Sequence, residues 1–178
     1  MTVRIAFLRA VNVGRRRVPM SVLSSLCRDL GYADPRTHVN SGNVVFSTTG
    51  SRASVEKAME KALEAEFGFE CTTFVRTARE LANIVEDKPF PVAPGDTHFV
   101  TFLKEAPAAG AAKLLEGLSN DFDTLVVHGA DVHWRMRGKS TDSRLVKRDW
   151  ERILGPLSST SRNMTMLTKL NAKIEATR

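Results

Sequence analysis

A strand–helix–strand–strand–helix order occurs twice along the 178 residues and predicts an α+β protein with two ferredoxin-like (split β-α-β plait) subdomains in tandem. A stretch with three prolines, residues 88–96, separates the two occurrences. Proline cannot continue a helix, and it stiffens a connector. We therefore predict an N-terminal subdomain over residues 1–88, a proline-rich connector over 89–97 and a C-terminal subdomain over 98–178.

The elements of the first half follow from apolar spacing and from residues typical of helix ends. Apolar side chains at successive positions indicate a first strand that is covered on both faces. Pro19 suits the first turn of a helix, and Gly31 suits its end. The predicted elements are the strand 3–9, the helix 19–30, the strands 36–40 and 43–48, the helix 52–67, the strand 69–76 and a helix from 77 to about 87.

The second half shows the same order without a repeat at the level of residues. A glycine at position 129 marks a hairpin, and Gly155 followed by Pro156 stops a helix. Asn163 is a residue type that caps a helix N-terminus, so a final helix begins there. The predicted elements are the strand 98–104, the helix 108–118, the strands 124–128 and 131–137, the helix 144–154 and a final helix to about 176.

Composition and charge bound the class of protein. The 42% hydrophobic and 26% charged residues are ordinary for a globular protein and argue against disorder, collagen and coiled coil. Residues 1–50 carry seven basic and two acidic side chains, and residues 151–178 carry five and two, so the +6 excess lies at the two ends. If the ends meet, their surface attracts phosphates or acidic partners.

The N-terminus and the cysteines bear on the cellular location of the protein. The first nine residues lack the apolar core of a signal peptide, and no run approaches the roughly 20 apolar residues that span a bilayer. We expect a cytoplasmic protein with no membrane partner. Cys27 and Cys71 lie in apolar phases of a predicted helix and a predicted strand, so we expect two buried thiols and no disulfide.

The loop after the first strand is the first candidate site. Asn12, Gly14 and Arg15 lie between a strand and a helix N-terminus, followed by Arg16 and Arg17. Backbone N–H groups and the helix dipole at such a place favour an anion, and arginine donates two hydrogen bonds to a phosphate. The alternative is a solvated basic loop in which Gly14 supplies a turn.

Two further polar turns complete the candidate ligand site. Ser41, Gly42 and Asn43 offer donors, or else form only a hairpin turn. Near the C-terminus, Arg162, Asn163 and Lys169 offer cations and an amide, or else a capped helix with surface charges. We expect the three segments to converge into one basic cleft between the subdomains.

Several other signals are set aside. Gly138-Lys139-Ser140 lacks the first glycine of a phosphate-binding P-loop, because His133 stands there. Arg144, Arg148 and Arg152 form the solvated face of an amphipathic helix. His128 and His133 face each other across the hairpin, but no acidic or sulfur ligand has clear metal spacing, so we expect no metal and no cofactor.

Several short motifs are distributed over the whole chain: AFLRAVNVG at 6–14, VPM at 18–20, SGNVVF at 41–46, VRT at 75–77, PFP at 89–91, SRL at 143–145, LG at 154–155 and SRN at 161–163 with Thr165 and Lys169. Together they resemble a bacterial family of uncharacterised proteins, domain of unknown function 1697. The resemblance implies two ferredoxin-like subdomains. It implies no reaction, substrate or cofactor.

Three functions remain open on these observations. The first is non-catalytic binding of an anionic ligand, either a phosphorylated small molecule or, with less support, a nucleic acid backbone. The second is an enzyme acting on a phosphorylated metabolite with Ser41 or His38 in proton transfer, although no pair of base and nucleophile is visible. The third is an oligomerising scaffold. The sequence leaves the oligomeric state open.

Overall fold

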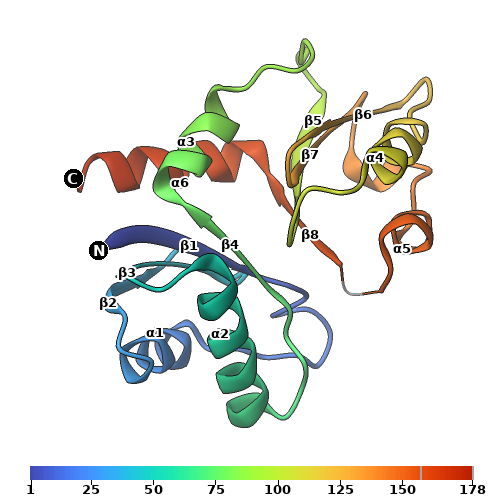
Figure 1. The fold of residues 1–178 in the computed structure, drawn as a ribbon. Coiled ribbons are helices and arrows are strands. Elements are labelled where there is room, and N and C mark those ends of the chain that lie inside the picture. The colour runs from blue at the N-terminus through green and yellow to red at the C-terminus, as the bar shows by residue number, and fades with distance from the viewer. Residues whose placement is uncertain (157, 178) are drawn as a thin grey trace. The chain divides into compact units, whose positions relative to one another are not determined.

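The computed structural model describes residues 1–156 and 158–177, which divide into two compact units, Met1–Leu81 and Ala82–Arg178 (Figure 1). Each unit contains one four-stranded antiparallel sheet. Among the residues that the structure describes, no helix has the length and apolar character needed to cross a membrane.

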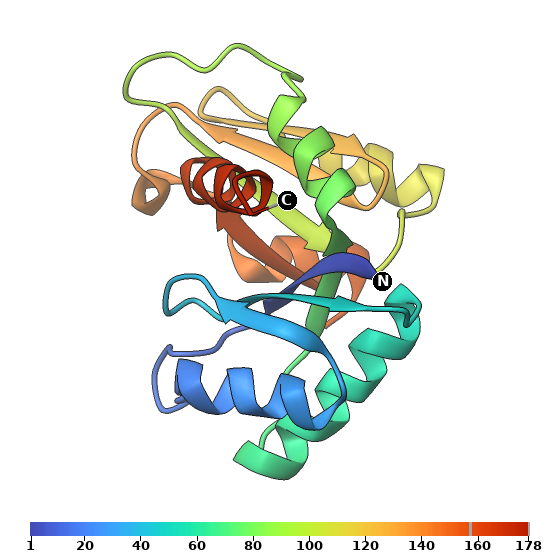
Figure 2. The ribbon, with the colours of Figure 1, turned by 90° about the vertical axis from the view of Figure 1, so that its left-hand side faces the viewer.

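The N-terminal unit has the strand and helix order of a split β-α-β plait. Its sheet runs β2-β3-β1-β4, so that the first strand lies between two later ones. Figure 2 shows both helices on one face of this sheet. The elements are β1 (Thr2–Leu8), α1 (Met20–Asp29), β2 (Ala33–Thr37), β3 (Asn43–Thr48), α2 (Arg52–Phe67) and β4 (Thr73–Thr77).

The core of the N-terminal unit lies between its sheet and its two helices. Ala6 and Leu8 of β1 and Phe46 of β3 point to this side, where Leu23 of α1 and Met59 of α2 meet them. The opposite face of the sheet is buried too, since Ile5, Phe7 and Phe74 have no exposed surface. The strand covered on both faces that the sequence predicts is thus confirmed.

Helix ends in this unit follow the local signals of the sequence. Ser51 caps α2 by accepting a hydrogen bond from the Ser54 N–H, and Gly68 ends it with φ at +70°. The Glu80 carboxylate accepts from the Thr77 N–H at 2.7 Å, and the Thr77 hydroxyl accepts from the Glu80 N–H at 3.1 Å. This reciprocal pair is a capping box, and it opens α3 (Ala78–Glu86).

The C-terminal unit has the same connectivity. Its sheet runs β6-β7-β5-β8, which places each strand as its counterpart lies in the first unit. The elements are β5 (Thr97–Leu103), α4 (Ala109–Glu116), β6 (Asp123–His128), β7 (Asp131–Met136), the 3-10 turn η1 (Ser140–Asp142), α5 (Lys147–Leu154), β8 (Ser159–Asn163) and α6 (Met164–Glu175). The chain is therefore two ferredoxin-like units in tandem, each followed by an extra helix.

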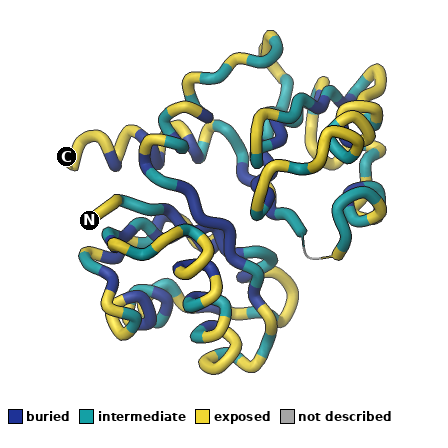
Figure 3. The backbone as a smooth tube through the Cα atoms, in the orientation of Figure 1, coloured by how far each residue is buried: buried dark blue, intermediate teal, exposed yellow. Residues whose placement is uncertain are grey.

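Leu115 of α4 and Trp150 of α5 pack against Leu103, Leu125 and Val132 on one face of the second sheet. The helix α6 lies along β5 and β8. Figure 3 shows buried stretches following the strands, while the helices alternate between buried and exposed positions. One face of the sheet thus holds an apolar core, and residues of the opposite parity, including His133, point the other way.

Four sequence predictions differ from the structure. The strand β4 covers Thr73–Thr77 instead of 69–76. The strand β8 was not predicted because its residues, STSRN, show no apolar alternation. The strand β2 covers Ala33–Thr37 instead of 36–40, with Pro35 tolerated because β2 is an edge strand paired only with β3. The helix α5 begins at Lys147, so Arg144 precedes it, and of the three arginines only Arg148 and Arg152 are exposed on this helix.

Candidate functional site

The side chain of Asn12 joins the two polar loops of the N-terminal unit. Its Nδ2 donates to the Asn40 carbonyl at 2.6 Å and to the Val18 carbonyl at 3.1 Å, and its Oδ1 accepts from the Val18 N–H at 3.0 Å. The sequence expectation that the loop 12–18 lies beside the turn near residue 41 holds within this unit. Asn12 acts as a clamp between the two loops, because its side-chain amide is hydrogen-bonded to Val18 and Asn40.

The turn at residues 41–43 is built into the sheet. Asn43 is fully buried, and its Nδ2 donates to the His38 carbonyl at 2.8 Å and to the Ser41 Oγ at 2.9 Å. A Cβ placed on Gly42 would lie 2.3 Å from Cγ2 of Val11, so only glycine fits there without a shift of its neighbours. Gly42 and Asn43 therefore position the turn, and the Ser41 side chain remains exposed at its surface.

The arginines of the first loop have different surroundings. The guanidinium of Arg16 lies 5.2 Å from the centroid of the Phe69 ring, and its Nη1 donates to the Glu70 carbonyl at 3.4 Å. Arg15 and Arg17 are exposed on either side of it. The Arg16 N–H donates to the Val13 carbonyl across a tight turn with Gly14 at its tip. One arginine thus holds the loop, and two face solvent.

The N-terminus of α1 follows this loop directly. Its N-cap residue is Pro19, and no side chain there accepts a hydrogen bond from the first turn. The first turn also contains no acidic residue. The first backbone N–H groups and the helix dipole therefore give a local positive potential beside the arginines.

Non-glycine residues with positive φ gather in these loops. Ala10, Asn12 and Val39 have φ between 50° and 56°. Such a backbone is uncommon, above all for a β-branched residue such as Val39. The contacts around Asn12 and Asn43 hold this conformation against its local cost.

The third predicted segment lies in the C-terminal unit. Arg162 is buried, and its Nη1 donates to the Thr160 Oγ1 at 2.9 Å and to the Ser161 carbonyl at 3.0 Å. Asn163 caps α6 by accepting from the Thr165 N–H at 2.8 Å, as predicted. Lys169 is exposed on α6. The convergence of this third segment with the loops of the first unit stays a prediction from the sequence.

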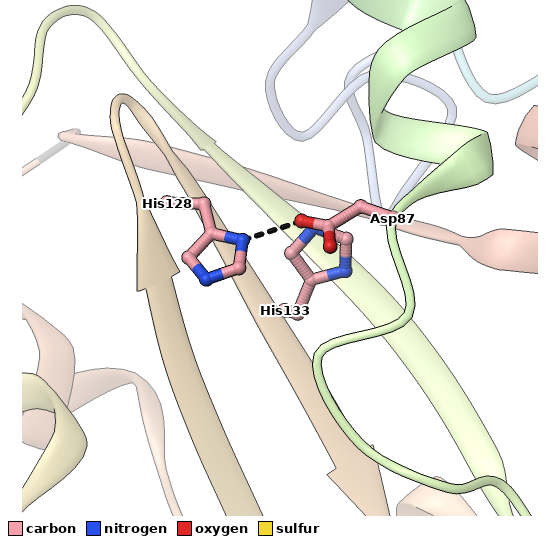
Figure 4. Close-up of side chains that lie close together, drawn as sticks. All are labelled: Asp87, His128 and His133. Carbon is pink, nitrogen blue, oxygen red and sulfur yellow. Dashed lines mark hydrogen bonds and ion pairs between the residues drawn. The ribbon is translucent and has the colours of Figure 1, made fainter.

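A separate group of ionisable side chains lies on the second sheet. His133 of β7 stands between His98 of β5 and His128 of β6, each two residues from the position directly opposite it. The His98 Nε2 lies 3.0 Å from the His133 Nδ1. Asp87, the residue after α3, hydrogen-bonds to the His128 Nδ1 and has its Oδ2 3.4 Å from the His133 Nε2. Figure 4 shows both imidazole rings close to this carboxylate.

Burial decides the charge of two of these histidines. Desolvation lowers the pKa of His98 to about 4, with the charge of His133 lowering it further. Desolvation also lowers the pKa of His133, against the opposing effect of Asp87. The Phe90 ring covers both, with its centroid 5.0 Å from that of His98 and 6.4 Å from that of His133. Both imidazoles are therefore neutral at pH 7.

Sequence reasoning joined His128 and His133 but did not find Asp87. The rings of the two histidines lie 5.8 Å apart, as expected across a hairpin. Asp87 is 41 residues before His128 and reaches it from the end of a helix, so no local spacing could reveal it. A histidine on each of three strands of one predicted sheet was the available signal.

The two cysteines are free and buried, as predicted. Burial raises the pKa of the Cys27 thiol to about 12, and the nearby charge of Arg28 opposes this only in part. The Cys71 Sγ lies 3.7 Å from the Arg9 carbonyl. Both side chains therefore serve as small apolar groups of the core.

Fold and site together define a tandem ferredoxin-like protein with cationic loops in one unit and a histidine–aspartate group in the other. A family model described as "Protein of unknown function (DUF1697)" matches residues 1–133, and the chain belongs to this family. The resemblance drawn from the sequence motifs is thereby confirmed.

One solved structure is similar over nearly the whole chain. It is described as the structure of conserved bacterial protein SP0830 from Streptococcus pneumoniae, with a TM-score of 0.73 and 17% identity. The match covers 98% of this chain and 99% of that one. At this identity, the likeness shows the fold alone. No curated protein matches the chain.

Proposed function

We propose that the N-terminal unit binds an anionic, phosphate-bearing ligand without catalysis, at the loops 12–18 and 38–43. The observation that carries the proposal is the position of Arg15 and Arg17, both exposed, beside a helix N-terminus that has no side-chain cap. Guanidinium groups donate paired hydrogen bonds to phosphate oxygens, and backbone N–H groups at a helix start add further donors.

The residues of the predicted site divide into contacting and positioning roles. Arg15 and the backbone of Gly14 supply donors to the ligand, and the exposed Ser41 hydroxyl is within the same loop pair. Asn12 positions the loops through its contacts to Val18 and Asn40. Gly42 and Asn43 position the turn.

The well-defined conformation of the loop 12–18 supports ligand binding there. Arg16 is held over Phe69, and Asn12 closes the base of the loop, so the two exposed arginines extend from an ordered backbone. Ordering a loop before the ligand arrives lowers the entropic cost of binding. A small phosphorylated molecule suits a site of this size better than a long nucleic acid, since only two exposed cations lie at the loop.

The test is calorimetric titration of the full chain with inorganic pyrophosphate at low salt. We expect the double variant Arg15→Ala/Arg17→Ala to bind at least about tenfold more weakly, which corresponds to about 1.4 kcal/mol. The matched control, Lys57→Ala/Lys61→Ala, removes the same charge from exposed positions of α2 and should bind as the wild type does.

Equal losses in both double variants would reduce the effect to net charge and contradict the site. A nucleic acid ligand is distinguished by salt, because each phosphate contact adds to the fall of log affinity with log salt. Binding of a single-stranded oligonucleotide with a steep salt dependence, combined with weak pyrophosphate binding, would favour nucleic acid. Lys169→Ala tests whether the C-terminal segment contributes, as predicted from the sequence.

A further inference from the structure

We propose that Asp87, His128 and His133 form a binding site for a divalent transition-metal ion of the Zn²⁺ type. The ligand atoms are a carboxylate oxygen of Asp87, Nδ1 of His128 and Nε2 of His133, and all three lie within 4.8 Å of one another. They form the one such group in the residues that the structure describes. The site lies in the C-terminal unit and shares no residue with the proposed anion site.

The fold brings the three ligands together from separate elements. His128 ends β6, and His133 lies in β7, so both histidines come from one antiparallel hairpin. Their side chains lie on the sheet face opposite the core of Leu125 and Val132. Asp87 follows α3, and its backbone N–H donates to the Asn83 carbonyl at 2.9 Å. This hydrogen bond fixes the backbone position from which the Asp87 side chain extends.

The spacing of the donor atoms fits a metal. Two ligand atoms that each lie about 2.1 Å from a tetrahedral ion are about 3.4 Å apart. The separation of Asp87 Oδ2 from His133 Nε2 is 3.4 Å. The Asp87–His128 pair is closer, as a direct hydrogen bond requires, so metal binding replaces that hydrogen bond and moves the exposed His128 ring outward.

The surroundings of His133 support the same reading. Its side chain is 1% exposed, and its second ring nitrogen, Nδ1, faces the His98 Nε2 at 3.0 Å. A metal-binding histidine commonly donates its other N–H to a neighbouring acceptor, which fixes the ring and its tautomer. His98 therefore acts as a positioning residue, and Phe90 packs against it.

The donor set decides the class of ion. Two imidazole nitrogens and one carboxylate oxygen suit Zn²⁺, Co²⁺ and other first-row transition metals, whereas Mg²⁺ and Ca²⁺ prefer oxygen ligands. The side chains of His128 and Asp87 are 49% and 30% exposed. Three protein ligands at a partly exposed place leave a coordination position for water or for a small ligand.

The experiment is a titration of the metal-free full chain with Zn²⁺ by calorimetry and with Co²⁺ by visible absorption. We expect one ion per chain. The chain has four histidines, and NMR should show the ring signals of His98, His128 and His133 moving while that of His38, in the N-terminal unit, does not. Mg²⁺ at the same concentration should move none of them.

Three variants and a matched control complete the test. Asp87→Asn keeps the shape of the side chain, and His128→Ala changes a half-exposed residue, so both variants should fold. Each should weaken Zn²⁺ binding at least about tenfold, and His98→Gln should weaken it less than either. Asp142→Asn, an exposed carboxylate on η1, should bind as the wild type does.

Three outcomes would overturn the proposal. The first is the absence of a saturable one-to-one signal with the wild type. The second is binding that Asp87→Asn and His128→Ala leave unchanged. The third is a shift of the His38 signal alone. In each case the group is a hydrogen-bonded His–Asp–His network without an ion.

Discussion

The Asn12 Nδ2 donates to the Asn40 carbonyl at 2.6 Å, across 28 residues of sequence. This hydrogen bond connects the loop after β1 with the turn before β3, and β1 and β3 are themselves paired from Thr2↔Thr48 to Phe7↔Asn43. The loops that carry the proposed anion site are therefore fixed to the central strands of the sheet. Their geometry depends on the amide of Asn12, which joins the two loops, together with that of Asn43, which holds the turn.

Asn12→Ala should destabilise the N-terminal unit. The variant leaves the Val18 N–H and carbonyl without the Asn12 side chain, and alanine tolerates φ of +56° less well than asparagine. We expect a loss of about 2 kcal/mol or more in the free energy of unfolding, measured by urea denaturation. Asn12→Asp keeps an acceptor for the Val18 N–H and should lose less. An alanine variant as stable as the wild type would contradict the clamp.

Alanine variants of Gly42 and Gly14 distinguish the cost of a strained backbone from the cost of a steric clash. Both have positive φ, +75° and +56°, but a Cβ on Gly42 meets Val11 at 2.3 Å and Leu8 at 2.9 Å, while one on Gly14 meets nothing within 4 Å. Gly14→Ala should cost about 1 kcal/mol, and Gly42→Ala about 1–3 kcal/mol more. Equal losses in thermal or urea unfolding would show that the turn at Gly42 moves to make room.

The capping box of α3 gives a pH-dependent contribution to stability. Burial alone would raise the pKa of Glu80, but the hydrogen bonds from Thr77 and the charge of Arg52 outweigh it and hold this pKa below its usual value of 4.5. A lowered pKa in the folded state means that the stabilisation is present above pH 4.5 and is lost as the pH falls below it.

The matching variant is Glu80→Gln, which keeps the shape and removes the charge. It should be less stable than the wild type at pH 7 by about 1 kcal/mol or less, because the side chain is partly exposed. The difference should shrink between pH 4.5 and pH 3. A difference that stays constant over this range would contradict the assigned charge interactions.

The two thiols should resist modification in the folded chain. Cys27 is fully buried, and burial raises its pKa to about 12, so almost none of it is thiolate at pH 8. We expect a thiol reagent at this pH to label Cys27 and Cys71 only after unfolding in denaturant. Labelling of either residue at the rate of a free thiol, in a chain that remains folded, would be inconsistent with the core described here.

Local signals in the sequence were sufficient for most of the fold. The helix α2, Arg52–Phe67, agrees with the predicted range of about 52–67, and Ser51 and Gly68 mark its ends by local hydrogen bonding and positive φ. The strand β8 was missed, because Ser159–Asn163 has no apolar pattern and is a strand only through its pairing with β5. The first kind of signal is contained in a short segment, and the second depends on a distant strand.

The same distinction explains the candidate sites. The basic loop and the turn at residue 41 could be found because each is a contiguous segment, and strand pairing of β1 with β3 made them neighbours. The roles of Asn12 and Asn43 could not be predicted, since their amides are used on Val18, Asn40 and His38 through tertiary contacts. Asp87 joins His128 and His133 only in the folded unit.

The most direct test of the proposed function is an NMR titration of the isotope-labelled full chain with inorganic pyrophosphate, with chloride at matched ionic strength as the control. We predict that the backbone amides of residues 13–17 and of the first turn of α1 shift together and saturate, while the amides of α2 do not move. Shifts spread over all exposed basic residues, or no shift in the loop 12–18, would contradict the account.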